Sequence, residues 1–449
     1  MNVIIFGAGM VGNTVAKFLT EQDHNVTLVD HRPEIIQEIQ ESLDIQTLLG
    51  EATGRGVMQQ AGLEQADLVL AVTDSDETNI VLSLIVQSQN RNARTIVRLR
   101  GQHYMENSGL WQERSLDRTL VFSPEQAAVE RLLDLLEVSR AFEVTSFLGG
   151  AVRIAGFSLD VSSPLIGQPL MQLAVLPETQ TLIVAVEQQG EIIVPTGKTV
   201  LQAGDRIYVT TGLGFNNTKV RNLFGLHATK QRKVLLAGGG WMGARVAEQL
   251  LKGGIDVTII ERDRSRCRWL AETMDGLTVI NGGATDHNKM RDELDGASTF
   301  VGITNKHEVN FIAALMAHKL NVKRVIAVMD NEAYLNMAPS VGIDAAVSPK
   351  LAAVGMILRI LRTGQMIDVA PMLNGRLEAV FVEVRANSRL DHHPINRLGL
   401  PKGVIIAAVM RDQAILIPHG NLMLTPGDKA LFIAPSGTLR HIGRMLEAA

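Results

Sequence analysis

The glycine-rich loop GAGMVG spans residues 7–12, and a second loop of the same pattern, GGGWMG, begins 231 positions later and spans residues 238–243. Each loop follows a short apolar run and precedes a segment with helical periodicity. One G-x-G-x-x-G alone is a weak indication of a nucleotide site, because glycine is common in turns. Two copies in matching surroundings predict two similar strand–turn–helix units in one polypeptide.

The repeat extends beyond the loops. The spacing of 231 also relates Asp30 to Glu261. The segment SPEQAAVERLLDLLEV (123–138) matches SPKLAAVGMILRILRT (348–363), and both are typical of helices in which Ser caps the N-terminus and Pro occupies the first turn. Two strand-rich stretches correspond as well, 181–210 and 403–433. The whole chain is therefore predicted to be a tandem duplication.

Each half is predicted to have two parts. Alternating apolar strands and longer amphipathic helices come first, as in βαβ units with a parallel sheet, and a small module of short strands and turns follows. The expected fold class is α/β, a tandem duplication of a Rossmann-like subdomain followed by a small β-rich α+β subdomain. The expected boundaries are 1–124 and 125–212 for the first half, 213–231 for a linker, and 232–347 and 348–449 for the second half.

The composition is that of an ordered protein. With 449 residues, 46% of them hydrophobic, the chain is long enough for roughly two to four packed domains. The formal net charge of −4 gives no general attraction to nucleic acid or to an anionic membrane surface. No apolar run approaches the roughly 20 residues that cross a bilayer. We expect a cytoplasmic protein that binds no nucleic acid and does not insert into a membrane.

Neither the cysteine content nor the histidines predict a metal site. Cys267 is the only cysteine, which excludes an internal disulfide and a thiolate cluster. Asp391, His392 and His393 form a short run with metal-ligand chemistry, but one such run is more often a solvated surface cluster. No metal is predicted.

The first glycine loop has the context of a dinucleotide site. Gly7 permits the tight turn, Gly9 lets the backbone approach a pyrophosphate, and Gly12 allows close packing of helix on strand. A second strand ends in Asp30, 18 residues after Gly12. A carboxylate there can accept hydrogen bonds from both ribose hydroxyls and would repel the 2′-phosphate of NADP. NAD or another adenosine nucleotide is favoured.

Other candidates lie where later strands end. Thr73 and Asp74 follow the buried strand LVLAV at the carboxyl edge of the sheet, where ligands bind in open α/β folds; the alternative is a helix N-cap. Arg98 in IVRLR could reach phosphates, or be solvated. Candidates for the adenine side are Glu51, Ala52 and Thr53, which follow the apolar run LLG.

The second half preserves this spacing, with Glu261 again 18 residues after Gly243. It departs from the first half where Asp74 becomes Asn305 and Arg98 becomes Met329. The second half is therefore also predicted to bind a nucleotide, without a defined preference.

Duplicated Rossmann units, each followed by a β-rich module, resemble the TrkA family of Trk-system potassium uptake regulators, which consist of tandem RCK (KTN) units. The segments that carry the resemblance are IIFGAGMVG, LVD, AVTDSDETN, IVRLR, SPEQ, AGDRIYV and PGDKALFI. The resemblance covers essentially the whole chain. It implies a cytosolic subunit that forms a homotetrameric ring beneath a membrane-embedded Trk-type potassium channel and gates it on binding NAD or NADH, ATP or ADP.

Motif and resemblance together give the expected site. The cofactor-binding residues of the first half are Gly7, Ala8, Gly9, Met10, Val11, Gly12, Asp30, Thr53, Thr73, Asp74 and Arg98. Those of the second half are Gly238, Gly239, Gly240, Trp241, Met242, Gly243, Glu261 and Thr304.

The alternative function is an NAD-dependent oxidoreductase acting on a small substrate. Such an enzyme needs an acid or base beside the nicotinamide and a substrate domain with converging polar groups. The two β-rich modules repeat their turn residues but share no His, Lys or Tyr constellation of that kind. The sequence therefore favours regulation, and no enzyme activity is expected.

Overall fold

The computed structural model describes residues 1–20, 24–101, 103–104, 118–138, 140–173, 175–212, 214–224, 233–294, 297–361, 366–373, 376–435 and 438. The chain forms two compact units. One unit comprises Met1–Ala128 and Pro349–Leu361, and the other comprises Val129–Ser348 and Arg362–Ala449. Much of the predicted linker, 213 and 225–231, lies outside the described residues; within the rest of it, Asn217 caps the short helix α9 (Thr218–Leu223).

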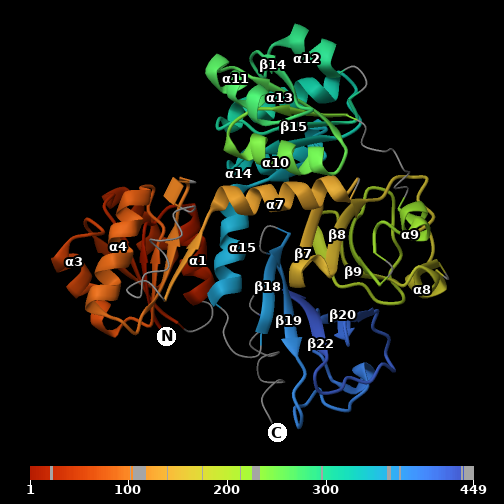
Figure 1. Ribbon diagram of the computed structural model, residues 1–449. Helices are drawn as coiled ribbons and strands as arrows, with labels where there is room; N and C mark the ends of the chain where they lie inside the picture. Colours follow the sequence, from red (N-terminus) through yellow and green to blue (C-terminus); the bar gives the residue numbers. More distant parts are fainter. Residues whose placement is uncertain are drawn as a thin grey trace. The chain divides into compact units, whose positions relative to one another are not determined.

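In the first unit, the described residues form a six-stranded parallel sheet of order β3-β2-β1-β4-β5-β6 (Figure 1). Its strands are β1 (Asn2–Phe6), β2 (Asn25–Asp30), β3 (Gln46–Leu49), β4 (Leu68–Ala71), β5 (Arg94–Arg98) and β6 (Thr119–Phe122). Its helices are α1 (Met10–Thr20), α2 (Pro33–Ser42), α3 (Arg55–Gln60) and α4 (Asp76–Gln89). This is the strand order of a doubly wound dinucleotide-binding sheet, and the strand order reverses between β1 and β4, where such folds bind ligands.

Both faces of this sheet are covered, which explains why its strands read as continuous apolar runs. Alternate residues of β1 enter different cores: Val3 and Ile5 pack with α1, whereas Ile4 and Phe6 pack on the side of α4. All four are at most 2% exposed. Strand β1, which leads into the glycine loop, is therefore fixed by hydrophobic packing on both faces of the sheet.

The second Rossmann-like sheet repeats this order among the described residues, as β14-β13-β12-β15-β16-β17. Its strands are β12 (Lys233–Ala237), β13 (Asp256–Glu261), β14 (Thr278–Asn281), β15 (Thr299–Gly302), β16 (Val325–Val328) and β17 (Ala345–Val347). Its helices are α10 (Trp241–Lys252), α11 (Arg264–Thr273), α12 (His287–Leu294), α13 (His307–Lys319) and α14 (Glu332–Met337).

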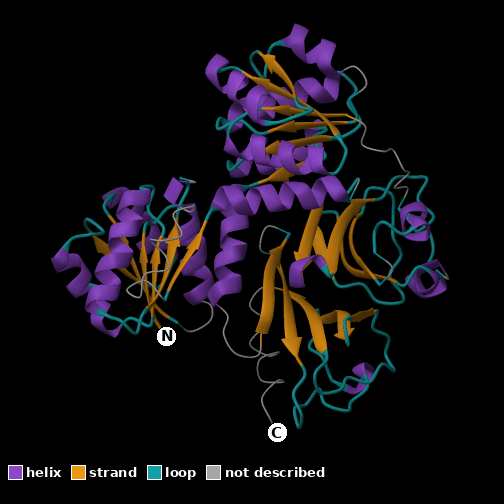
Figure 2. Ribbon diagram, viewed as in Figure 1, coloured by secondary structure: helices purple, strands orange, loops and turns teal. Residues whose placement is uncertain are grey.

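Two antiparallel sheets form the β-rich modules (Figure 2). The first has the order β10-β9-β11-β8-β7, with β7 (Glu143–Phe147), β8 (Val152–Ser158), β9 (Thr181–Gln188), β10 (Glu191–Ile193) and β11 (Arg206–Thr211), and the short helix α8 (Val175–Glu178). The second has the order β18-β19-β22-β20-β21, with β18 (Met366–Met372), β19 (Leu377–Glu383), β20 (Ile405–Arg411), β21 (Ala414–Leu416) and β22 (Lys429–Pro435). Read in chain order, the two topologies are the same. The predicted fold class is confirmed.

A long helix follows each parallel sheet in the sequence, α7 (Pro124–Glu137) and α15 (Pro349–Leu361). Although α15 follows the second sheet, it belongs to the first unit and packs on α1. Its Ala353, Val354 and Ile357 lie in the core that contains Val3 and Ile5. The sequence did not predict this exchange of a helix between the halves.

Candidate functional site

The first glycine loop connects β1 to α1, and two of its glycines are required by the protein itself. Gly7 has a φ of +108°, and a Cβ atom there would lie 2.8 Å from the backbone nitrogen of Thr73. A Cβ atom on Gly12 would lie 1.9 Å from the carbonyl oxygen of Gly7. No side chain fits either position without moving backbone. These glycines therefore hold the turn and the helix against the sheet.

Gly9 differs, because a Cβ atom on it would meet no atom of the protein within 4 Å. Gly9 is exposed and lines a cavity of about 260 Å³ at the carboxyl edge of the sheet. Glycine at this position leaves room for a group that approaches the backbone at the start of α1. The space that a Cβ atom would fill fits the pyrophosphate of a dinucleotide.

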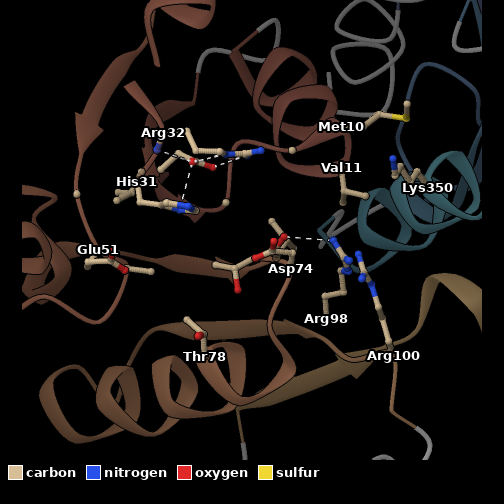
Figure 3. Close-up of a pocket in the computed structure, with 18 residues that line it drawn as sticks. Met10, Val11, His31, Arg32, Glu51, Asp74, Thr78, Arg98, Arg100 and Lys350 are labelled. Carbon is tan, nitrogen blue, oxygen red and sulfur yellow. Dashed lines mark hydrogen bonds and ion pairs between the residues drawn. The ribbon is translucent and has the colours of Figure 1, made fainter. Parts of the chain in front are cut away.

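The cavity gathers most of the predicted residues of the first half (Figure 3). Those that line it are Gly7, Gly9, Met10, Val11, Asp30, Thr73, Asp74 and Arg98. Glu51 and Ala52 also line it, whereas Thr53, the next residue of the same turn, does not. Ala8 and Gly12 do not line the cavity. The Ala8 amide donates to Asp30, and Gly12 packs closely against the Gly7 carbonyl.

Asp30, at the end of β2, is held by its neighbours. Its carboxylate accepts hydrogen bonds from the amide of Ala8 at 2.7 Å and from the amide of Arg32 at 3.0 Å. The guanidinium of Arg32 donates to both oxygens, at 2.9 and 3.0 Å. Burial alone would raise the pKa of Asp30, but the hydrogen bonds from Arg32 and Ala8 outweigh it and lower the pKa to about 2. The carboxylate is thus a fixed anion facing the cavity.

Thr73 is held by Asn79, a fully buried residue of α4. The Asn79 side-chain oxygen accepts from the Thr73 amide at 3.0 Å and from the Thr73 hydroxyl at 2.7 Å. Its side-chain nitrogen donates to the carbonyl oxygens of Thr73 and Arg98. One amide side chain thus joins the ends of β4 and β5. The N-cap of α4 is Ser75, so neither Thr73 nor Asp74 has the capping role that was the alternative for them.

Arg98 ends β5 beneath the cavity and is only 8% exposed. It donates a long hydrogen bond, 3.4 Å, to the carbonyl oxygen of Val72, and its Nε has no hydrogen-bond partner among the described residues. Burial and the neighbouring Arg100 lower the pKa of Arg98. A buried cation with an unmet donor is costly unless an anion comes close to it.

Most cationic side chains of the cavity lie toward one of its ends (Figure 3). Arg98, Arg100 and Lys350 lie at the end of Val11, near the first turn of α1, whereas Arg32 and Glu51 lie at the other end. The sequence reading missed His31, Arg32, Arg100 and Lys350. The first three follow predicted strand ends and could have been found there, but Lys350 comes from α15 and carried no local signal.

The second glycine loop repeats the backbone arrangement. Gly238 has a φ of +125°, a Cβ atom on Gly243 would lie 2.0 Å from the Gly238 carbonyl oxygen, and one on Gly240 would meet nothing within 4 Å. Trp241 and Met242 open α10. The Glu261 carboxylate accepts from the amide of Gly239 at 2.8 Å and from that of Asp263 at 2.8 Å.

The Thr73 network also recurs in the second half, where the Asn310 side chain bonds the amide and hydroxyl of Thr304 and the carbonyl of Val328. The side chains around the loop differ. Arg266 donates at 2.7 Å to the Gly239 carbonyl oxygen. Met329, which replaces Arg98, is fully buried. The second site therefore keeps the loop but lacks the buried cation.

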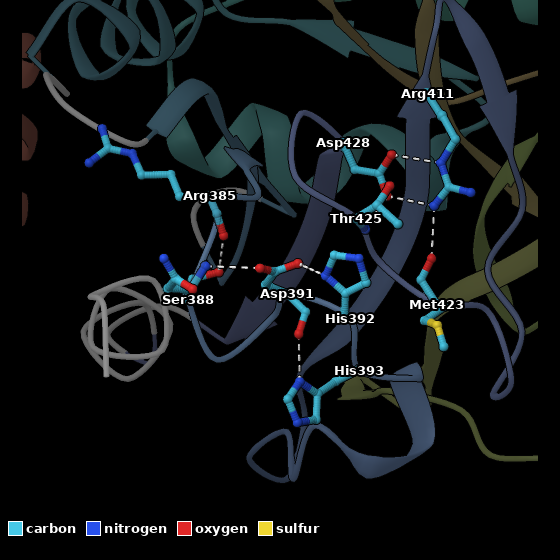
Figure 4. Close-up of polar contacts among 10 residues, drawn as sticks. Arg385, Ser388, Asp391, His392, His393, Arg411, Met423, Thr425 and Asp428 are labelled. Carbon is cyan, nitrogen blue, oxygen red and sulfur yellow. Dashed lines mark hydrogen bonds and ion pairs between the residues drawn. The ribbon is translucent and has the colours of Figure 1, made fainter.

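The Asp391, His392 and His393 run is an exposed loop cluster (Figure 4). The Asp391 carboxylate bonds the His392 ring and the amide of Asn387, while the His393 ring bonds the Asp391 carbonyl oxygen at 2.7 Å. Within the described ranges, no group of three or more His, Cys, Asp or Glu side chains could hold a metal ion. Nor is any helix there both long and apolar enough to span a membrane.

Comparison with known proteins identifies the family. The TrkA-N domain matches residues 3–110 and 234–349, and the TrkA-C domain matches residues 154–212 and 379–447. The Trk system potassium uptake protein TrkA of Halomonas elongata is 30% identical over 100% of this chain and 99% of its own length.

Two solved structures share the fold. The GsuK RCK domain has a TM-score of 0.58 at 20% identity and covers 99% of this chain and 94% of its own. The GsuK channel bound to NAD has a TM-score of 0.58 at 19% identity and covers 99% of this chain and 78% of its own. The matched domains and the full-length relative together show that this chain belongs to the TrkA family of Trk system potassium uptake proteins.

Proposed function

We propose that this chain is the nucleotide-binding regulatory subunit of a Trk-type potassium uptake system. It binds NAD or NADH, or ATP or ADP, at its glycine loops and thereby controls potassium transport through a membrane-embedded channel subunit. Membership of the TrkA family supports the potassium system, and the cavity of the first unit supports the nucleotide.

Two features of one cavity carry the nucleotide assignment. Gly9 leaves open space at the start of α1, and Arg98, a largely buried cation, lines the same cavity. Backbone N–H groups at a helix N-terminus and a buried guanidinium both favour an anion, and phosphate has the matching charge and geometry. An apolar ligand would offer neither group a partner.

The carboxylate of Asp30 supports an adenosine ribose at the other end. It is fixed at the end of β2, where a carboxylate accepts hydrogen bonds from ribose hydroxyls and disfavours a 2′-phosphate. When bound, NAD or an adenine nucleotide would place its ribose at Asp30 and its phosphates between Gly9 and Arg98. The chain's own residues bind and orient the ligand, and we assign them no catalytic step.

Regulation follows if the bound and free states differ in shape. A ligand shifts a conformational equilibrium only by its difference in affinity for the two states, and a swing from 1:99 to 99:1 requires about 10⁴-fold. Two glycine loops in each chain make such a difference attainable. We further propose that four chains close a ring of eight RCK units on the cytoplasmic face of the channel, since symmetric closure is usual for homo-oligomers.

Potassium flux through the reconstituted channel tests the proposal. Flux is measured with and without this protein, across NAD, NADH, ATP and ADP, using wild type and Gly9→Ala. We expect flux to respond to nucleotide only when the wild-type protein is present, and the response of Gly9→Ala to be reduced. Flux that is indifferent to nucleotide and protein, despite demonstrated binding of each, would contradict the gating function.

A further inference from the structure

Lys350 reaches the first nucleotide cavity from the other half of the sequence. It lies in the first turn of α15, which follows the second parallel sheet along the chain but belongs to the first unit. Ala353, Val354 and Ile357 anchor the helix in the core beneath α1. This packing places the half-buried Lys350 in the lining of the cavity, at the same end as Arg98 and Arg100 (Figure 3).

A lysine is an unfavourable choice for that position in a helix. The first turn carries the positive end of the helix dipole, so acidic residues stabilise it and cations do not. The matching helix α7 follows this rule with Glu125 in its first turn, whereas the first turn of α15 has no acidic residue. In the repeat SPEQ/SPKL, Glu125 and Lys350 occupy the same place. A lysine at the positive end of a helix, in the lining of a cavity, indicates that an interaction with a negative group offsets the unfavourable helix dipole.

The surroundings indicate an anionic ligand. Arg98 is more than nine-tenths buried, lines the cavity and has an unmet Nε donor. The backbone amides of Arg100 and Gly101 donate to the Asp76 carboxylate at 2.7 to 3.0 Å, which fixes the chain segment that carries Arg100. Three cationic side chains thus line the end of the cavity opposite Arg32, which forms an ion pair with Asp30.

We propose that Lys350 contacts the phosphate groups of the nucleotide in the first site. Helix α15, from the second half of the sequence, would thereby bind a ligand held by the first half. This inference rests on the proposed nucleotide function and names its ligand class, an adenine nucleotide with at least two phosphates. Its ribose end is selected by Asp30 and its phosphate end by Arg98, Arg100 and Lys350. Binding thereby ties α15 to the first glycine loop.

Titration calorimetry and thermal melting of the full-length protein test the inference, with ADP and adenosine as probes. The variant Lys350→Glu restores the residue type found in α7, so the helix should keep or gain stability. The affinity for ADP should fall at least about tenfold, the effect of losing one charge-assisted hydrogen bond, while the affinity for adenosine changes less than about threefold. The melting temperature without ligand should not fall.

Lys17→Glu is the matched control, because Lys17 is an exposed lysine of α1 outside the cavity lining. It should leave ADP affinity within about twofold of wild type. If Gly9→Ala loses ADP while Lys350→Glu retains it, the role of Lys350 is overturned and the nucleotide function stands. If wild type binds neither ADP nor NADH, or if Gly9→Ala binds both as well as wild type does, both the role of Lys350 and the nucleotide function are overturned. Equal losses for ADP and adenosine in Lys350→Glu also overturn the phosphate contact.

Discussion

Asp30 accepts a hydrogen bond of 2.7 Å from the backbone amide of Ala8, so the proposed ribose-binding carboxylate also holds the glycine loop in place. The same relation recurs between Glu261 and the amide of Gly239, at 2.8 Å. Each carboxylate therefore stabilises its loop before any ligand arrives, which reduces the reorganisation that binding requires.

The stability of the first unit is expected to depend on pH through Asp30. Its folded pKa of about 2 lies below the ordinary value of 3.8, so the stabilisation is present above pH 4 and is lost as the pH falls toward 2. A shift of this size corresponds to up to about 2 kcal/mol, of which about half should remain at pH 3. Urea unfolding of wild type and Asp30→Asn from pH 7 to 3 measures it. The difference between them should shrink with acid; a constant difference would contradict this origin. Asp44→Asn, at an exposed carboxylate, is the control.

The two glycine loops are expected to be separate binding sites. Asp30→Asn should weaken NADH or ADP binding in the first half at least about tenfold, and Glu261→Gln should act mainly on the second half, because charge-assisted hydrogen bonds contribute roughly 1.5–3 kcal/mol. Two-site calorimetry on the full chain, with each single variant and the double variant, separates the effects. Weakening of the first site alone by Glu261→Gln would contradict the two-site assignment.

Glycine substitutions should separate fold from function. Gly9→Ala should unfold in urea like wild type, because its Cβ atom meets nothing, yet bind nucleotide poorly. Gly12→Ala should be strongly destabilised, by several kcal/mol, because its Cβ atom would lie 1.9 Å from a carbonyl oxygen. Gly240→Ala makes the matching change in the second half, where a Cβ atom also meets nothing, and should leave nucleotide binding by the first half unchanged. Wild-type nucleotide affinity in Gly9→Ala would remove the argument for a ligand at this position.

The residues that the sequence predicted are those that depend on local chain geometry. A glycine loop between strand and helix, a carboxylate at the next strand end and a Thr after a buried strand are fixed by spacing alone, and the repeat supplied a second reading of each. Arg98 could be placed at the edge of the sheet for the same reason, but its burial could not be foreseen.

Contacts between distant segments were not predictable. Nothing in the sequence near Lys350 indicates that α15 packs on α1, because its apolar face would fit any parallel sheet of this family. Arg32 was overlooked because the strand end was assigned to Asp30 alone, although the two side chains form an ion pair at 2.9 Å. Single-sequence patterns give a helix's apolar face, not its partner.

No turnover of NADH is expected with small carbonyl or hydroxyl substrates. Hydride transfer needs a positioned acid or base beside the nicotinamide, and we assign that role to no residue around the first cavity. Absorbance at the NADH band, followed with a panel of such substrates, tests this. Steady oxidation that depends on one substrate and disappears in Gly9→Ala would favour the oxidoreductase.

Arg324 is expected to be a principal stabiliser of the second unit. It is 6% exposed and donates to the carbonyl oxygens of Leu135, Val138 and Ala141, at 2.6, 3.0 and 3.0 Å. Leu135 lies in the last turn of α7, and the other two residues follow it. Burial lowers the pKa of its guanidinium to about 10, so it remains charged at neutral pH, where a cation complements the negative end of a helix.

Arg324→Met should therefore leave three carbonyl groups without their donor and destabilise the unit by about 3 kcal/mol or more. Hydrogen exchange of the last turn of α7 reports this locally, which matters because a chain of several domains does not unfold in one step. Lys323→Met is the control, since Lys323 is the exposed neighbour and loses the same charge. Protection at the end of α7 should fall in Arg324→Met and stay unchanged in Lys323→Met. If both variants exchange like wild type, the cation does not hold the helix end, and the stability of α7 must come from its apolar face alone.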